Sequence, residues 1–331
     1  MSVGTIAIAG FFLISGFVIP MALERYRPVR YFVARFFRIW PAWLACLALT
    51  LATLAAYGRY ADRPFPYSAE VVLQNASLLP DWFLAPYVNP VAWTLTVELK
   101  FYILCGLLAC CGGLTRPGPI LAVTGVLTAL AGAASGDYQR LVAEDSALAV
   151  PALIVGLNGR YITFMFIGVT AYNLFCGRWS RRRAGSVGTA LFAMFVAGTL
   201  AGPDLRVWKI ATLVSFSIGL AWFCAFYVLR DRLPFTPAID FLADISYPFY
   251  ALHYVVGLTL LTVMYDLYPS AYLALPVTLV SSPPSPTSCT ATSNGRLTAS
   301  ASRRAPARPG ADRIGRRHGG DPQLRPGRPG P

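Results

Sequence analysis

Long apolar stretches, separated by shorter polar or charged segments, run through residues 4–281 of this 331-residue chain. A helix needs about 20 mainly apolar residues to cross the roughly 30 Å of hydrocarbon in a bilayer, and each stretch comes close to that length. We therefore predict an all-α polytopic membrane protein with about nine transmembrane helices. With edges placed to within several residues, the predicted spans are 4–20, 41–57, 94–111, 118–134, 159–177, 185–201, 208–229, 246–265 and 269–281.

The composition supports this fold class. Hydrophobic residues make up 56% of the chain and charged residues only 13%, whereas soluble domains carry about 25% charged residues. Six of the 7 cysteines fall in or beside apolar stretches without metal-ligand or disulfide spacing, so we interpret these six as small buried side chains. The two histidines are His253 and His318, and we expect no metal site and no bound cofactor.

The C-terminal segment differs from the rest. From Ser281 onward the chain is rich in proline, glycine and arginine and has only two acidic residues, Asp312 and Asp321. Such a composition cannot form a packed core. We therefore divide the chain into a transmembrane domain, 1–280, and a disordered basic tail, 281–331.

Arginine residues cluster in alternate connections between the predicted spans. By the positive-inside rule, these connections face the cytoplasm. They contain Arg25, Arg27, Arg30, Arg35, Arg38, Arg116, Arg178, Arg181, Arg182, Arg183, Arg230 and Arg232. The opposite side holds the sparser Arg59, Arg63, Arg140, Arg160, Arg206 and Lys209. This orientation places Met1 outside, and we therefore expect a further helix before Met1.

The strongest candidate for chemistry is the stretch Trp93-Thr-Leu-Thr-Val-Glu98-Leu-Lys100-Phe-Tyr102, which opens a predicted span. Ionisable groups inside a span are costly and therefore mark candidate functional sites. Glu98 and Tyr102 are four residues apart and share a helix face, whereas Glu98 and Lys100 do not. We expect Glu98 and Lys100 to have separate partners; a purely structural Glu98 is the alternative.

Arg35 and Arg38 lie three residues apart in a basic, aromatic segment. Paired guanidinium groups at a cytoplasmic mouth suit phosphate binding, because their forked donors match phosphate oxygens. Positive-inside topology with anionic lipid explains the same charges. The nearby aromatic residues fit an interfacial belt; they are Tyr31, Phe36, Phe37 and Trp40.

Two further candidates are weaker taken alone. His253 ends the stretch Ser246-Tyr-Pro-Phe-Tyr-Ala-Leu-His253 and is the one histidine of the predicted membrane domain. A neutral imidazole accepts protons near pH 7, although a histidine that only bonds neighbouring helices is the alternative. Ser15 lies in Phe11-Phe-Leu-Ile-Ser15-Gly-Phe17, where small residues favour close helix packing.

Taken in chain order, these four stretches resemble motifs of the acyltransferase-3 family of membrane O-acyltransferases, and the resemblance covers roughly residues 4–280. They correspond to that family's second helix, arginine motif, tryptophan–glutamate–tyrosine motif and late serine–tyrosine–histidine motif. The resemblance implies transfer of an acyl group, often acetyl from acetyl-CoA, to a hydroxyl of a carbohydrate, glycolipid or similar acceptor.

The resemblance also implies roles for individual residues. Arg35 and Arg38 would hold the acyl-CoA donor. Glu98, Tyr102 and His253 would be catalytic, and Ser15 and Trp93 would bind substrate. The expected partners are acyl-CoA, the acceptor and the lipid bilayer, without nucleic acid, at a bacterial inner or plasma membrane.

The chain departs from the family pattern at both ends. The family's first helix, with its arginine and proton-abstracting histidine, would lie before Met1, so we expect the chain as given to be inactive or severely impaired. The family's last helix is replaced by the basic tail. A one-base shift of frame across Ser288–Arg296 is compatible with the family ending Leu-His-Arg-Tyr-Ile-Glu-Arg-Pro, and a natural tail that binds anionic lipid or nucleic acid is the rival.

Two alternatives to an active acyltransferase stay open. Glu98, Lys100 and His253 could form the proton relay of a proton-coupled transporter or flippase. A catalytically inactive, truncated remnant of the family is the other alternative.

Overall fold

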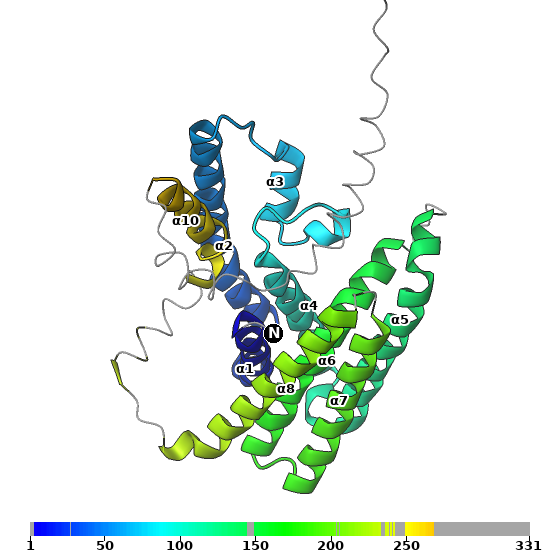
Figure 1. Ribbon diagram of the computed structural model, residues 1–331. Coiled ribbons are helices and arrows are strands. Elements are labelled where there is room, and N and C mark those ends of the chain that lie inside the picture. Colours follow the sequence, from blue (N-terminus) through cyan, green and yellow to red (C-terminus); the bar gives the residue numbers. More distant parts are fainter. Residues whose placement is uncertain are drawn as a thin grey trace, which may run out of the picture. The chain divides into compact units, whose positions relative to one another are not determined.

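The computed structural model describes residues 3–267 except 27, 144–148, 203, 205, 233–235, 238, 240 and 242–248. All described residues belong to one compact unit, 1–289. This described part contains helices and connections and no strand (Figure 1). The helices are α1 Val3–Arg25, α2 Pro28–Tyr60, α3 Ala69–Ala76, η1 Pro80–Phe83, α4 Ala92–Cys110, η2 Gly113–Thr115, α5 Pro117–Ala143, α6 Ala149–Phe175, α7 Arg181–Ala201, α8 Arg206–Leu229, η3 Arg230–Arg232 and α10 Val255–Leu267.

Local sequence explains several helix ends. Pro117 begins α5, at a position where the missing amide hydrogen of proline costs nothing. Ser180 caps α7 by accepting a hydrogen bond from the Arg183 amide at 3.3 Å. Gly112 and Gly177 follow α4 and α6 with φ of 63° and 70°, and such left-handed conformations favour glycine at helix C-termini.

Five of the described helices are long and apolar enough to cross a membrane: Val3–Arg25, Val29–Tyr60, Ala92–Cys110, Arg181–Ala201 and Arg206–Arg232. Two shorter apolar helices, Pro117–Ala133 and Val255–Asp266, overlap the predicted spans 118–134 and 246–265. The all-α membrane class is therefore confirmed, whereas the number of nine spans is not. The predicted span 269–281 and the predicted disordered tail, 281–331, lie outside the described residues.

Helix α1 packs against α4, α6 and α8, and α6 also packs against α5 and α7 (Figure 1). The crossing of α1 and α6 depends on glycine. A Cβ atom on Gly16 would overlap the backbone oxygen of Met165, and one on Gly168 would overlap the backbone of α1. The predicted small-residue packing around Ser15 is therefore confirmed at its neighbour Gly16, because only glycine lets two backbones come this close.

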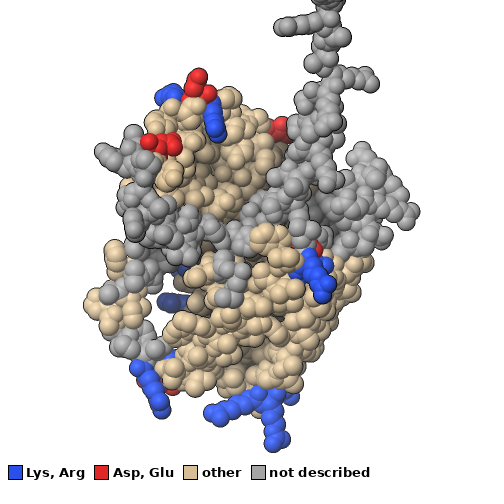
Figure 2. All heavy atoms as spheres, in the orientation of Figure 1, with Lys and Arg blue, Asp and Glu red and all other residues tan. Residues whose placement is uncertain are grey.

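Arginine side chains gather at one end of the helices. Figure 2 shows blue side chains over the start of α7 and the end of α8, at the bottom of the view. The connections that meet there are joined by contacts: Arg178 pairs with Glu24 at 2.6 Å, and the Trp179 indole donates to the Thr115 carbonyl at 2.9 Å. The connections after α1, α4 and α6 thus meet at a common end, as predicted. Arg30, Arg35 and Arg38, predicted in a connection, instead lie within the long helix α2.

Arg160, one of the sparser cations predicted on the opposite side, is at the edge of the predicted span 159–177. It lies inside α6, is only 2% exposed, and forms an ion pair with Asp204. Its guanidinium also donates to the Tyr161 hydroxyl at 3.1 Å. A buried cation is tolerated in a helix when it is paired and hydrogen-bonded in this way.

Candidate functional site

Glu98 lies in the middle of a small hydrogen-bonded cluster between α1 and α4. Ser15 donates its hydroxyl to Glu98 Oε1 at 2.9 Å, and the Tyr102 hydroxyl donates to the same oxygen. Glu98 is 6% exposed, and Ser15 and Tyr102 are also buried. The shared face of Glu98 and Tyr102 is confirmed, and the structure adds Ser15 from another helix.

Lys100 has a separate partner, as the helix geometry predicts. It forms an ion pair with Asp81 of η1, and the Asn158 side chain donates to the same carboxylate at 3.3 Å. Lys100 therefore ties α4 to η1 and α6. Its charge is satisfied away from Glu98, which leaves the Glu98 carboxylate for a different role.

Arg35 brings a positive charge to the Glu98 cluster. Its guanidinium carbon lies 5.3 Å from the centre of the Tyr102 ring and 5.6 Å from that of Tyr31. Both Arg35 and Arg38 are near enough to interact electrostatically with Glu98. Arg35 is half-buried and Arg38 is exposed. Arg35 thus lies over the phenol that donates to the carboxylate, and not only at a bilayer surface.

Tyr31 is a candidate residue that the sequence analysis assigned to an interfacial belt. The structure buries it completely, with its ring 6.5 Å from that of Tyr102. Among the described residues its hydroxyl finds no hydrogen-bond partner. The signal in the sequence was its spacing, because Tyr31 and Arg35 are four residues apart and share a helix face.

Trp93 lies in an aromatic cluster one turn before the Glu98 site. Its ring centre is 6.0 Å from that of Phe12 on α1 and 5.0 Å from that of Tyr161 on α6. Tyr161 in turn packs against Phe216 of α8 at 5.5 Å. Trp93 is only 8% exposed, so in this structure it packs four helices together, and its predicted contact with substrate stays a prediction.

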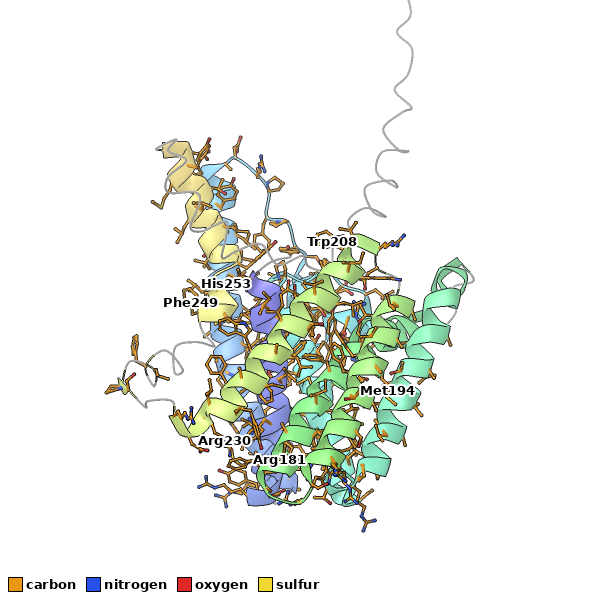
Figure 3. The ribbon with its side chains drawn as sticks, turned by 60° about the horizontal axis from the view of Figure 1, so that its bottom comes forward. Arg181, Met194, Trp208, Arg230, Phe249 and His253 are labelled. Atoms are coloured by element: carbon orange, nitrogen blue, oxygen red, sulfur yellow. The ribbon has the colours of Figure 1, made fainter. Side chains whose placement is uncertain are left out.

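The late motif reaches α4 through Tyr250 rather than through His253. The Tyr250 and Thr94 hydroxyls are 2.9 Å apart, and Thr94 is one turn before Glu98. His253 is hydrogen-bonded through Nδ1 to the Tyr250 carbonyl at 2.6 Å, and its ring stacks on Phe249 (Figure 3). Ser246 lies outside the described residues. A catalytic role for His253 stays a prediction.

The described residues hold no group of three or more histidine, cysteine or acidic side chains that could bind a metal. The cysteines that the structure describes are all free. The chemistry of the site therefore comes from one carboxylate, two phenols, a serine hydroxyl and two guanidinium groups. Such a set can bind an anion, hold a cationic or polarised group in place, and donate hydrogen bonds to a carbonyl oxygen.

Comparison with known proteins gives one result. A family model described as an acyltransferase domain, of the acyltransferase-3 type, matches residues 1–284. No curated protein sequence and no solved structure matches the chain.

Proposed function

Because this chain belongs to the acyltransferase-3 family, we propose that it transfers an acyl group, in particular acetyl, from acyl-CoA to a hydroxyl of a carbohydrate or similar acceptor. The membrane acyltransferase class follows from the family and the apolar helices. The donor and the acceptor are part of the proposal. The single observation that carries it is that Arg35 lies over Tyr102, whose hydroxyl is bonded to Glu98.

This arrangement suits an anionic thioester donor. In the proposal Arg35 and Arg38 bind the phosphates of acyl-CoA, because guanidinium groups match phosphate oxygens with paired donors. The arginine-rich end faces the cytoplasm, where acyl-CoA is available, and the chain resides in a bacterial inner or plasma membrane. Glu98 then lies beside the bound donor and not in the phosphate site itself.

The acyl transfer step needs a base for the acceptor hydroxyl and donors for the developing oxyanion. Glu98 accepts two hydrogen bonds on Oε1, so its geometry is fixed. In the proposal the base is the histidine that the family resemblance implies, and it takes the proton of the acceptor hydroxyl as the hydroxyl oxygen attacks the thioester carbonyl. The negative charge of Glu98 stabilises this protonated base, and the phenols of Tyr31 and Tyr102 lie beside the acyl carbonyl. The tetrahedral centre then collapses with cleavage of the C–S bond, and the CoA thiolate takes the proton from the base.

Proton-coupled transport is supported less well. That hypothesis uses Glu98, Lys100 and His253 as a relay. Within the described residues no hydrogen bond joins any two of them, since Lys100 pairs with Asp81 and His253 with the Tyr250 carbonyl.

The test is an acyl-transfer assay on the purified protein in lipid nanodiscs. Acetyl-CoA is supplied on the arginine-rich side with oligosaccharide or glycolipid acceptors, and free CoA and acetylated acceptor are measured. Because the base is expected on a helix before Met1, the assay compares the chain as given with a version extended upstream by that helix, and the proposal expects both products in equal amounts from the extended version. Proton-driven solute flux in proteoliposomes without release of CoA would instead support a transporter.

A further inference from the structure

A cavity of about 160 Å³ opens at the arginine-rich end of the helices, apart from the Glu98 cluster. A single enclosed water needs about 10–15 Å³ by this kind of measure, so the cavity has room for a ring-sized group. Its apolar walls come from α1, α4 and the connection after α4. They are formed by Pro20, Leu23, Ala109 and Leu114.

One polar atom of this cavity lacks a partner. Asn173 lines the cavity and is 1% exposed. Its Nδ2 donates to the carbonyls of Leu114 at 2.9 Å and Val169 at 3.0 Å, which fixes the orientation of the amide. Its Oδ1 is buried without a hydrogen bond. Buried acceptors are rarely left unpaired, so we expect this oxygen to accept a hydrogen bond from a bound ligand.

The rim of the cavity is charged. Arg178 and Glu24 line it and form two hydrogen bonds, of 2.6 and 2.8 Å. The Tyr172 hydroxyl donates to Glu24 at 2.9 Å and holds the carboxylate in place. Both charged side chains are partly exposed, and exposed Arg25 and Arg116 are next in sequence to rim and wall residues. The rim therefore offers positive charge to an anion outside the cavity.

Ala109 of the cavity lies on the same face of α4 as Glu98, farther along the helix. Glu98, Tyr102, Cys105 and Ala109 are spaced by four, three and four residues and so share one helix face. Ala109 lies seven residues beyond Tyr102, a rise of about 10 Å. That separation is of the size that a nucleoside covers between its base and its 5′-phosphates.

We propose that this cavity binds the adenine ring of the acyl-CoA donor, with the exocyclic amine donating to Asn173 Oδ1. The inference rests on the proposed function, since it assumes an acyl-CoA donor. The apolar walls cover the faces of the planar ring, the unpaired acceptor selects an amine, and the arginines of the rim lie near the ribose phosphate. The nucleotide end of the donor is thereby held at the arginine-rich end of the helices.

The first test uses the wild-type protein in nanodiscs and two ligands. CoA is compared with 1,N6-etheno-CoA, in which the amine is blocked by a fused ring. Because one hydrogen bond to a buried acceptor is lost, etheno-CoA is expected to bind about tenfold more weakly. Equal dissociation constants for the two ligands would overturn the assignment of the amine to Asn173.

The second test fills the cavity. Ala109→Phe places a ring among the walls, and Leu107→Phe, at a site on α4 that is 61% exposed, is the matched control. Ala109→Phe is expected to weaken CoA binding by about tenfold or more. The rate at which this variant transfers acetyl from S-acetyl-pantetheine, which lacks the nucleotide, is expected to stay unchanged. The control binds CoA as the wild type does.

The outcomes separate this inference from the proposed function. Unchanged CoA affinity in Ala109→Phe overturns the adenine site even if acyl transfer is normal. The adenine site is also overturned if phosphatidylethanolamine raises the thermal unfolding temperature and CoA does not. In that case the amine bound by Asn173 would be that of a lipid headgroup. A wild-type protein that binds CoA with the expected preference over etheno-CoA but transfers no acyl group supports the cavity assignment and contradicts the proposed function.

Discussion

The guanidinium group of Arg35 lies 5.3 Å from the centre of the Tyr102 ring. This contact joins α2 to α4 and puts a cation next to the phenol that donates to Glu98. A cation over an aromatic face is attracted by the ring, and the attraction holds the arginine close to the carboxylate without neutralising it directly. Three of the groups that the proposed acyl transfer uses, Arg35, Tyr102 and Glu98, are thereby fixed in one cluster.

Replacing Arg35 with alanine is expected to weaken acetyl-CoA binding by about ten- to a hundredfold, the range for loss of hydrogen bonds to a charged group. Arg35→Lys should restore only part of this affinity, because an ammonium lacks the fork and stacks less well on Tyr102. Arg38→Ala is also expected to weaken acetyl-CoA binding. Equilibrium binding in nanodiscs measures each effect, and unchanged affinity in both alanine variants would favour a purely topological role.

Tyr31→Phe removes a buried hydroxyl that has no partner. Because a buried unsatisfied polar group costs about 1–3 kcal/mol, the variant should be as stable as the wild type or more stable. Acyl transfer should nevertheless fall by about tenfold if the hydroxyl contacts the donor.

The matched control is Tyr161→Phe, since the Tyr161 hydroxyl accepts a hydrogen bond from buried Arg160. That variant should lower the thermal unfolding temperature. If Tyr31→Phe instead lost stability to the same degree, Tyr31 would have a structural partner and not a functional one.

Glycine at the crossing of α1 and α6 gives a prediction on stability alone. Gly16→Ala is expected to destabilise the protein by about 1–3 kcal/mol or more, because its Cβ would meet the backbone of α6. Gly10→Ala on the same helix is the control, since no atom lies within 4 Å of the added Cβ. Thermal unfolding in one detergent measures both, and equal unfolding temperatures would show that the crossing is looser than described.

The orientation in the membrane is tested by cysteine labelling in a variant without native cysteines. Residues 30 and 181 should react only with reagent on the cytoplasmic side, since the connections at the arginine-rich end are held together by Glu24 and Arg178. Residue 62, in the connection after α2, should react only from outside. Labelling of residue 30 from outside would reverse the orientation on which donor access depends.

The sequence was sufficient for features that depend on one helix. The helical repeat predicts that Glu98 faces Tyr102 and not Lys100, and both expectations hold. Long apolar stretches predict the helices themselves, although a turn at His253 and Tyr254 interrupts the predicted span 246–265 before α10. These features are local, because they follow from spacing and hydropathy along the chain.

Features that depend on packing between helices were not accessible. Ser15 is 83 residues from Glu98 in sequence, and no periodicity links them. Arg160 has no predicted partner, but Asp204, 44 residues away in sequence, pairs with it. Composition predicts an interfacial belt for Tyr31, because a basic segment with aromatic residues has the same composition whether it lies at a bilayer surface or lines a site.

The role of Glu98 is the centre of this account, and Glu98→Gln tests it most directly. Glutamine keeps an oxygen that can accept from Ser15 and Tyr102, and removing a buried charge should leave thermal stability unchanged or raised. The measurement is the rate of acetyl-CoA consumption at saturating donor in nanodiscs, variant against wild type. We predict a rate about a hundredfold lower with donor affinity unchanged. A variant that consumes acetyl-CoA at the wild-type rate would contradict the account and leave Glu98 as a structural residue.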